Sequence, residues 1–521
     1  MISQTLTLNE QHQWTEYFWS HLADRLQWAK LYVSAHKQKM SHLKPYGDSL
    51  FSLIRQGWQN PELSQLIVDL ILVLHPLPER WGYWESWAEV LQVGARIAVN
   101  PCQQAELLAY LSHLLWSCNR WSEAEDVGRG ALQKAAHLQE IFPLGIGGSA
   151  LIKSLCSSGR QEEAEQLLTY LLDKTADLGH YHPEHHTVSA LIYLKQSQAL
   201  LLRLQGRQAE AIIIARQMLQ LARENPDISP YQLGDTYVEQ ATMLWAGGDY
   251  KAAVQALQEA IHLFERTGDK VASVFANGSL GLVYWSMAQF ERAEQCVKQC
   301  IFFCEQFNIR WRVISQVGNL AVVYLGQGQL IEALHCAENH LELAQRYGHH
   351  WEAGRARLNR GAILTYLGSY ELALTSLNLS LEQVRAEGRQ ELIAAVLIDL
   401  SLCYDGLNQP EMAVQYAWNA YEMAVQMTFP GLRIISLRTL ARYGQISERV
   451  AWLQTALQLA QKHQRRFDEA GCLFSLVNLV TDESQRINCW HRAVQLLVEI
   501  GATAWLANHS LQCPPFTALM L

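Results

Sequence analysis

Apolar side chains recur three and four positions apart along most of the chain, a spacing that places them on one face of an α-helix. The segments "SLGLVYWSMAQFERAEQC" (279–296) and "NLAVVYLGQGQLIEALHC" (319–336) carry the same pattern twice, displaced by forty residues. In each segment an amphipathic stretch is followed by a turn and by a second amphipathic stretch. The pattern therefore predicts antiparallel helix pairs and an all-α fold.

The forty-residue spacing continues in both directions along the chain. A small residue returns in the second helix of each predicted pair, at Ala124, Ala164, Ala211, Ala253, Ala293, Ala333, Ala373 and Ala413. Glycine marks the turn between the two helices, at Gly159, Gly206, Gly247–Gly248, Gly326–Gly328 and Gly368, where a helix end needs a positive φ. No single pair can bury both of its faces, so the pairs must stack into a solenoid.

This pattern resembles the tetratricopeptide repeat, with about nine units over residues 79–430; the first would place Trp84 and Trp87 at the aromatic and alanine positions. The resemblance implies an α-solenoid, a right-handed superhelix of stacked antiparallel helix pairs with a concave groove. Residues 1–78 are expected to form a helical N-terminal capping region. Residues 431–521 are expected to form degenerate helical repeats and a C-terminal cap, because a solenoid must cover its exposed ends.

Four histidines lie close together at His180, His182, His185 and His186. They fall in the longest gap between alanine anchors, 47 residues between Ala164 and Ala211, which predicts an exposed loop between units with helix resuming at about Val188. The alternative is a zinc or copper site, which would need a further ligand and a fixed geometry. The segment also resembles the longer repeat of kinesin light chains, in which a His-Pro step in this loop corresponds to His182–Pro183.

Composition narrows the function classes. Apolar residues make up 49% of the 521 residues and charged residues 17%, which is enough apolar material for a continuous core. The net charge of −9 argues against nucleic acid or an anionic membrane as partner. The longest apolar run, "LIVDLILVL" (66–74), is too short to span a bilayer. The N-terminus has no signal-peptide pattern, and the eleven cysteines form no CxxC pair, so we expect a cytoplasmic protein with reduced thiols.

Candidate chemistry is sparse. Cys296, Cys300 and Cys304 share one helical stripe and are predicted to be packing thiols. The run "GIGGS" (145–149) lacks the spacing of a phosphate-binding loop and is predicted to be a close helix contact or a turn. No catalytic motif is recognised, so neither an enzyme nor a cofactor is predicted. Among the 17 tryptophans, the cluster Trp81, Trp84 and Trp87 is either core or an exposed contact site for a partner.

The resemblance implies where a partner would bind, because first helices line the concave side of tetratricopeptide arrays and their lining side chains are free for recognition. Projection of the helix period places five residues at equivalent groove positions: Glu239, Ser279, Asn319, Asn359 and Asp399. Trp285 and Arg355 complete the candidate set. Asn319 and Asn359 match asparagines that often hold a peptide backbone in the family; Trp285 would supply an apolar pocket and Arg355 would pair a carboxylate. The alternative for each is plain solvated lining.

These observations favour a non-enzymatic scaffold or adaptor, an assembly or regulatory factor that holds a peptide or helix of another protein in the groove. The tryptophan- and glutamine-rich repeats also resemble those that follow bacterial signalling ATPases, so a regulatory sensor acting in trans is the alternative. An RNA-binding solenoid and a metal protein built on the histidine loop are less favoured. The sequence does not indicate the oligomeric state.

Overall fold

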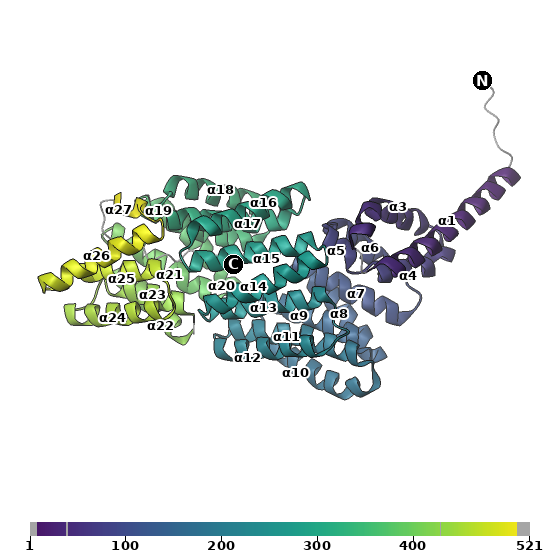
Figure 1. Ribbon diagram of the computed structural model, residues 1–521, viewed down its shortest axis with the longest axis horizontal. Helices are drawn as coiled ribbons and strands as arrows, with labels where there is room; N and C mark the ends of the chain where they lie inside the picture. The colour runs from purple at the N-terminus through teal and green to yellow at the C-terminus, as the bar shows by residue number, and fades with distance from the viewer. Residues whose placement is uncertain (1–7, 38–39, 428, 508–521) are drawn as a thin grey trace, which may run out of the picture.

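The computed structural model describes residues 8–37, 40–427 and 429–507. In these ranges every regular element is helical, and the helices stack in pairs as an α-solenoid (Figure 1). Before the regular pairs stand α1 (Leu8–His36), α2 (Met40–Leu43), η1 (Lys44–Tyr46), α3 (Gly47–Gly57), η2 (Pro61–Leu63), α4 (Ser64–Leu74), α5 (Leu77–Trp81) and α6 (Trp84–Ile97).

The regular helix pairs follow one another through the rest of the described chain. They are α7 (Pro101–Ser117) with α8 (Trp121–Leu138), α9 (Ile141–Ser157) with α10 (Gln161–Leu178), α11 (Glu184–Leu204) with α12 (Gln208–Glu224), α13 (Pro230–Ala246) with α14 (Tyr250–Arg266), α15 (Lys270–Ser286) with α16 (Phe290–Gln306), α17 (Arg310–Gln327) with α18 (Leu330–Arg346), α19 (His350–Tyr366) with α20 (Tyr370–Ala386), α21 (Gln390–Gly406) with α22 (Pro410–Gln426), α23 (Pro430–Leu440) with α24 (Ile446–Lys462), and α25 (Arg466–Val477) with α26 (Glu483–Glu499). The 3-10 turn η3 (Gly179–Tyr181) precedes α11, and α27 (Ala504–Ala507) follows α26.

The pair α13 and α14 shows why the sequence folds in this way. The Ser229 hydroxyl accepts the Gln232 N–H and caps α13, and proline at the first helical position has the required φ. Gly248, at φ 81°, ends the turn before α14, as the sequence predicts. The apolar stripe of α14 is then fully buried from the small Ala253 to the large Phe264, so one helix packs closely at its start and fills space at its end.

Successive turns of the superhelix touch one another. The Arg80 Nε of α5 lies 2.5 Å from the Asp269 carboxylate at the start of α15, 189 residues later. Arg465 donates to the Tyr250 hydroxyl at 2.9 Å across 215 residues. Figure 1 shows α5 and α6 beside α15, far apart in sequence. At forty residues per pair, these separations correspond to about five pairs per superhelical turn.

Gly159 and Gly388 meet at a close backbone approach between two turns. Gly159 has φ 74°, and a Cβ placed on it would lie 3.0 Å from the Glu387 carbonyl oxygen. A Cβ on Gly388 would lie 3.2 Å from the Gly159 Cα. Both positions need glycine for backbone conformation and for the close approach between turns.

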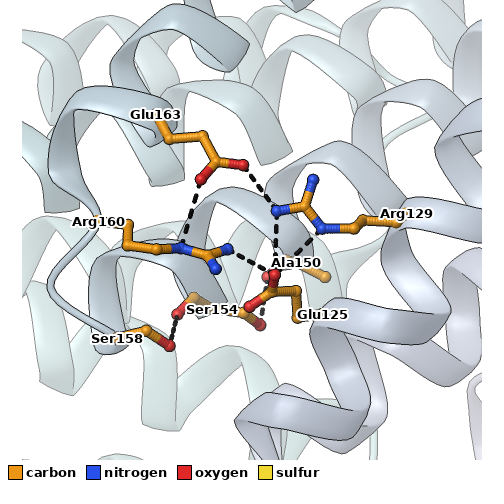
Figure 2. Close-up of polar contacts among 7 residues, drawn as sticks. All are labelled: Glu125, Arg129, Ala150, Ser154, Ser158, Arg160 and Glu163. Atoms are coloured by element: carbon orange, nitrogen blue, oxygen red, sulfur yellow. Dashed lines mark hydrogen bonds and ion pairs between the residues drawn. The ribbon is translucent and has the colours of Figure 1, made fainter.

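Neighbouring pairs are also joined on the outer surface. Arg129 and Arg160 each bridge Glu125 of α8 and Glu163 of α10, with N–O distances of 2.6 Å for Arg129–Glu163 and 2.5 Å for Arg160–Glu125 (Figure 2). These four side chains remain 16–48% exposed. Their ion pairs are therefore screened by solvent.

Several details of the sequence analysis can be compared with this fold. The run 145–149 is a close helix contact, as predicted, since a Cβ on Gly145 would overlap Ala190 of α11. Cys300 and Cys304 lie buried in α16 with their sulfur atoms 4.0 Å apart. The first helices α23 and α25, with 11 and 12 residues, are shorter than the 17 residues of α21. Across the described ranges no helix is long and apolar enough to cross a membrane.

Candidate functional site

The structure places most of the predicted lining residues inside the protein. Five of the seven are at most 7% exposed: Trp285, Asn319, Arg355, Asn359 and Asp399. Glu239 and Ser279 are half-buried. These five side chains are therefore buried in this structure rather than exposed on the lining, and Arg355, Asn319 and Asn359 form hydrogen bonds within the chain. Their role in binding a partner stays a prediction.

Arg355 is the centre of this internal bonding. Its Nε donates to the Glu352 carboxylate at 2.9 Å, one turn earlier on α19. Its Nη1 donates to the Asn319 Oδ1 of α17 at 2.8 Å, and its Nη2 donates to the Ser315 carbonyl oxygen at 2.8 Å. The predicted carboxylate partner of Arg355 thus exists, but it is Glu352 of the same chain.

His340 of α18 adds a hydrogen bond to the same ion pair. The His340 Nε2 lies 2.9 Å from the Glu352 carboxylate, and His340, Glu352 and Arg355 are all at most 2% exposed. Burial alone would raise the pKa of Glu352, but the Arg355 charge and the bond with His340 outweigh burial and hold that pKa at about 2. The carboxylate is therefore charged at neutral pH. Through His340 and Arg355 it links α19 to α18 and α17.

Glu239 lies in a different environment nearer the N-terminal end of the array. It follows Asp235 by one turn on the inner side of α13, and burial raises the pKa of both carboxyls. Gln196 links this site to α9, because it donates to Asp235 at 2.8 Å and accepts from Lys153 at 3.2 Å. Neither carboxylate has a Lys or Arg within ion-pair distance among the described residues.

The histidine loop lies between α10 and α11, as predicted. Helix α11 nevertheless begins at Glu184, not near Val188, because Pro183 sets an extended turn and the acidic Glu184 favours a helix N-terminus. The His182 Nε2 lies 2.8 Å from the Gln139 carbonyl oxygen, and His185 and His186 stand in the first turn of α11. Within the described parts of the chain, no three His, Cys, Asp or Glu side chains group closely enough to hold a metal ion.

A cleft of about 1000 Å³ opens between two turns of the superhelix. One wall comes from α6, α8 and the turn before α8, and the other from the starts of α17 and α19. Seven half-buried or exposed aromatic rings line it: Tyr83, Trp84, Trp121, Phe307, Trp311, Tyr347 and Trp351. Two tryptophan pairs bridge its walls, with ring centroids 5.6 Å apart for Trp84–Trp311 and 6.3 Å apart for Trp121–Trp351.

The polar groups of this aromatic cleft are mixed in charge. Arg120 donates twice to Glu123, at 2.7 Å each, and lies 3.4 Å from Glu85. The Arg310 guanidinium lies 5.5 Å from the centre of the Tyr347 ring. Burial raises the pKa of Glu387 at the rim. The cleft therefore combines apolar platforms with both donors and acceptors.

The sequence analysis did not identify this cleft, although it noted Trp84. Trp81 and Trp87 are buried core residues, whereas Trp84 lies on the cleft wall. Two signals were present: Trp311 and Trp351 are forty residues apart at equivalent positions, and Trp121 opens a second helix just as Trp84 does. The periodicity alone does not give the pitch of the superhelix, which brings the tryptophans of the two walls together.

Comparisons with known proteins agree with the fold. Residues 276–301 match the family model described as a tetratricopeptide repeat. A solved structure of a Rap protein complexed with competence and sporulation factor is 14% identical, with a TM-score of 0.53, and the match covers 68% of this chain and 98% of that chain. A structure of NprR in complex with its cognate peptide NprX is 16% identical, with a TM-score of 0.48, covering 67% and 98%.

No curated protein matches the sequence, and none of these matches supports the likeness to kinesin light chains. The repeat match covers most of α15 and most of α16, the segment whose pattern recurs every forty residues. Together with the stacked helix pairs, it supports a repeat architecture of the tetratricopeptide type for this chain.

Proposed function

We propose that this chain is a non-enzymatic binding protein that holds an extended segment of a partner protein in the aromatic cleft. The observation that carries the proposal is the convergence of seven aromatic rings, from two turns of the superhelix, on one cleft of about 1000 Å³. Aromatic side chains dominate binding energies at protein interfaces. A scaffold or adaptor role in assembly or regulation follows from such binding.

The chemistry of the cleft favours a particular kind of segment. Proline, aromatic and arginine side chains stack well on indole rings, and an extended backbone offers carbonyl and N–H groups to the mixed rim. Arg120 and Glu123 already neutralise each other at that rim, so a partner does not have to supply a large net charge. A peptide with aromatic or proline residues separated by polar ones fits this surface.

The alternative within the same class is a regulatory sensor that responds to a peptide and acts on another protein in trans. In its favour, the Rap structure with a similar fold was determined with a bound factor. The inner face near Asp235 and Glu239 is the second candidate position for a partner, since these two carboxyls are half-buried and lack an ion-pair partner among the described residues. Of the originally predicted lining set, Glu239 and Ser279 keep this proposed role.

The test compares the full-length wild type with three variants as baits for a phage-displayed library of random peptides. The wild type is expected to enrich a peptide family, and the double variant Trp121→Ala with Trp351→Ala is expected to lose at least tenfold of the affinity for it. Trp418→Ala is the matched control, because Trp418 is 41% exposed and does not line the cleft. Fluorescence anisotropy of a labelled, enriched peptide gives the affinities.

Two outcomes contradict the cleft as the binding site. In one, the double variant binds the enriched peptide as tightly as the Trp418 control does. In the other, Asp235→Asn with Glu239→Gln abolishes binding while the cleft variant retains it, which moves the site to the inner face. Melting temperatures within a few degrees of the wild type show that each variant is folded.

A further inference from the structure

The N-terminal helix α1 carries two faces, and only one is covered. Leu22, Leu26, Ala29 and Val33 are at most 2% exposed and pack into the core of the N-terminal helices. Figure 1 shows α1 extending outward at one end of the molecule. A second row lies roughly opposite, and all of its side chains are exposed: Trp14, Tyr17, His21, Asp24, Trp28 and Leu31.

This exposed row, here called the α1 seam, has the spacing of a coiled coil. Its members alternate three and four residues apart, which is the a and d pattern of a heptad repeat. The four large side chains Trp14, Tyr17, Trp28 and Leu31 are 60–65% exposed. The seam therefore has the geometry to pack along another helix. Its exposed aromatic side chains form an apolar patch of the kind that marks a protein–protein contact.

The seam is also symmetric about its own centre, between Leu22 and Ala23. Trp14 at one end corresponds to Leu31 at the other, Tyr17 corresponds to Trp28, and His21 corresponds to Asp24. A two-fold axis at this centre would place each large side chain of one helix against a large side chain of an antiparallel copy. It would also place each imidazole beside a carboxylate, twice, because a two-fold interface repeats every contact.

We propose that the α1 seam is the interface of an antiparallel homodimer, in which a second copy of this chain covers it. A parallel pair would set Asp24 against Asp24 and His21 against His21, which is unfavourable. The antiparallel pair instead forms two His21–Asp24 contacts at its centre, flanked by aromatic contacts. The covered face of α1 lies on the other side of the helix, so the two solenoids extend away from the seam without competing for it.

The orientation of the surrounding groups supports this arrangement. The Tyr17 and His21 rings are stacked, with centroids 6.3 Å apart and planes at 3°, so the imidazole is held on the seam before a partner arrives. Lys30 is engaged with Asp69 at 2.6 Å on the body side of α1. The central His21 and Asp24 then set the register of the dimer.

The test uses charge changes in the full-length chain and sedimentation equilibrium over a range of concentrations. Asp24→Arg and His21→Asp are each expected to raise the dimer dissociation constant by about tenfold or more. Asp24→Arg removes the carboxylate that faces His21 at both central contacts, and His21→Asp sets two carboxylates against each other there. The double variant His21→Asp with Asp24→Arg restores opposite charges and is expected to dimerise as the wild type does. An equimolar mixture of the two single variants is expected to form a mixed dimer.

These positions are exposed, so the variants are expected to keep the wild-type circular dichroism spectrum. A wild type that remains monomeric at every concentration overturns the proposal and leaves the seam to another protein. A dimer that persists in both single variants also overturns it. Dissociation of the single variants without recovery in the double variant overturns the antiparallel arrangement.

Discussion

Two networks of arginine and glutamate tie neighbouring helix pairs together, and they lie in opposite environments. On the outer surface, Arg129 and Arg160 bridge α8 and α10 with side chains 42–48% exposed (Figure 2). On the inner side, Arg355 and Glu352 are at most 3% exposed. The N–O distances in the two networks are similar. The networks differ in how far solvent reaches their side chains.

The difference teaches what each network contributes. An exposed ion pair exchanges its bonds for bonds to water at little cost, and salt screens it. A buried pair cannot, and removal of one member leaves the other charged group without solvent or partner. The inner network therefore fixes how α17, α18 and α19 pack, whereas the outer one adds only a small increment.

The largest effect is expected from Arg355→Met. The change leaves the Glu352 carboxylate buried without its main counter-charge, and we expect a loss of about 3–5 kcal/mol in the free energy of unfolding. Urea denaturation followed by circular dichroism measures it. A loss below about 1 kcal/mol would show that solvent enters the inner side and that the two networks are equivalent.

The pH dependence of this loss sharpens the comparison. In the wild type the pKa of Glu352 is held at about 2, so its contribution is complete above its unfolded pKa of 4.5 and is lost as the pH falls toward 2. Without Arg355, burial dominates and raises this pKa, so the folded variant protonates Glu352 readily. The stability gap between wild type and variant is therefore expected to start narrowing as the pH falls through the raised pKa of the variant, above 4.5, and to go on narrowing toward pH 2.

An intermediate effect is expected from Asn319→Ala. Asn319 is 3% exposed and accepts from Arg355, so its removal leaves one guanidinium N–H unsatisfied in the interior. We expect a loss of about 1–3 kcal/mol, visible as a lower melting temperature. An unchanged melting temperature together with lost partner binding would instead restore Asn319 to the binding role that the sequence suggested.

The smallest effect is expected from Arg160→Ala on the outer surface. The side chain is 42% exposed and Arg129 still bridges both glutamates, so the loss should stay below about 1 kcal/mol and vanish in high salt. Urea denaturation at two salt concentrations measures it. A loss as large as that of Arg355→Met would contradict the distinction between the two networks.

The repeat fold was predictable from sequence because its cause is local. Each alanine anchor and each glycine turn acts within one helix pair, and forty-residue periodicity repeats that local rule, so the helices and turns followed. The lining residues were predictable in position but not in exposure. Whether Asn359 faces solvent or the Gly318 carbonyl depends on how tightly successive first helices approach, and no single repeat encodes that distance.

The aromatic cleft escaped prediction for a related reason. Its walls belong to pairs that are far apart in the chain, and they meet only because the superhelix has a particular pitch. The small angular step between pairs sets that pitch, and it accumulates from many packing contacts. The α1 seam, by contrast, is a heptad pattern within one helix, yet it becomes informative only once the structure shows which face the body of the protein covers.

The contacts between turns also constrain the number of repeats. In an open repeat array each unit touches only its neighbours, so units can be gained or lost with little effect elsewhere. Here Arg80 bonds to Asp269, and Gly159 packs against Gly388, several helix pairs further along the chain. Deletion of one helix pair would rotate all later pairs out of alignment with the preceding turn. The contacts between turns therefore fix the number of helix pairs in this array.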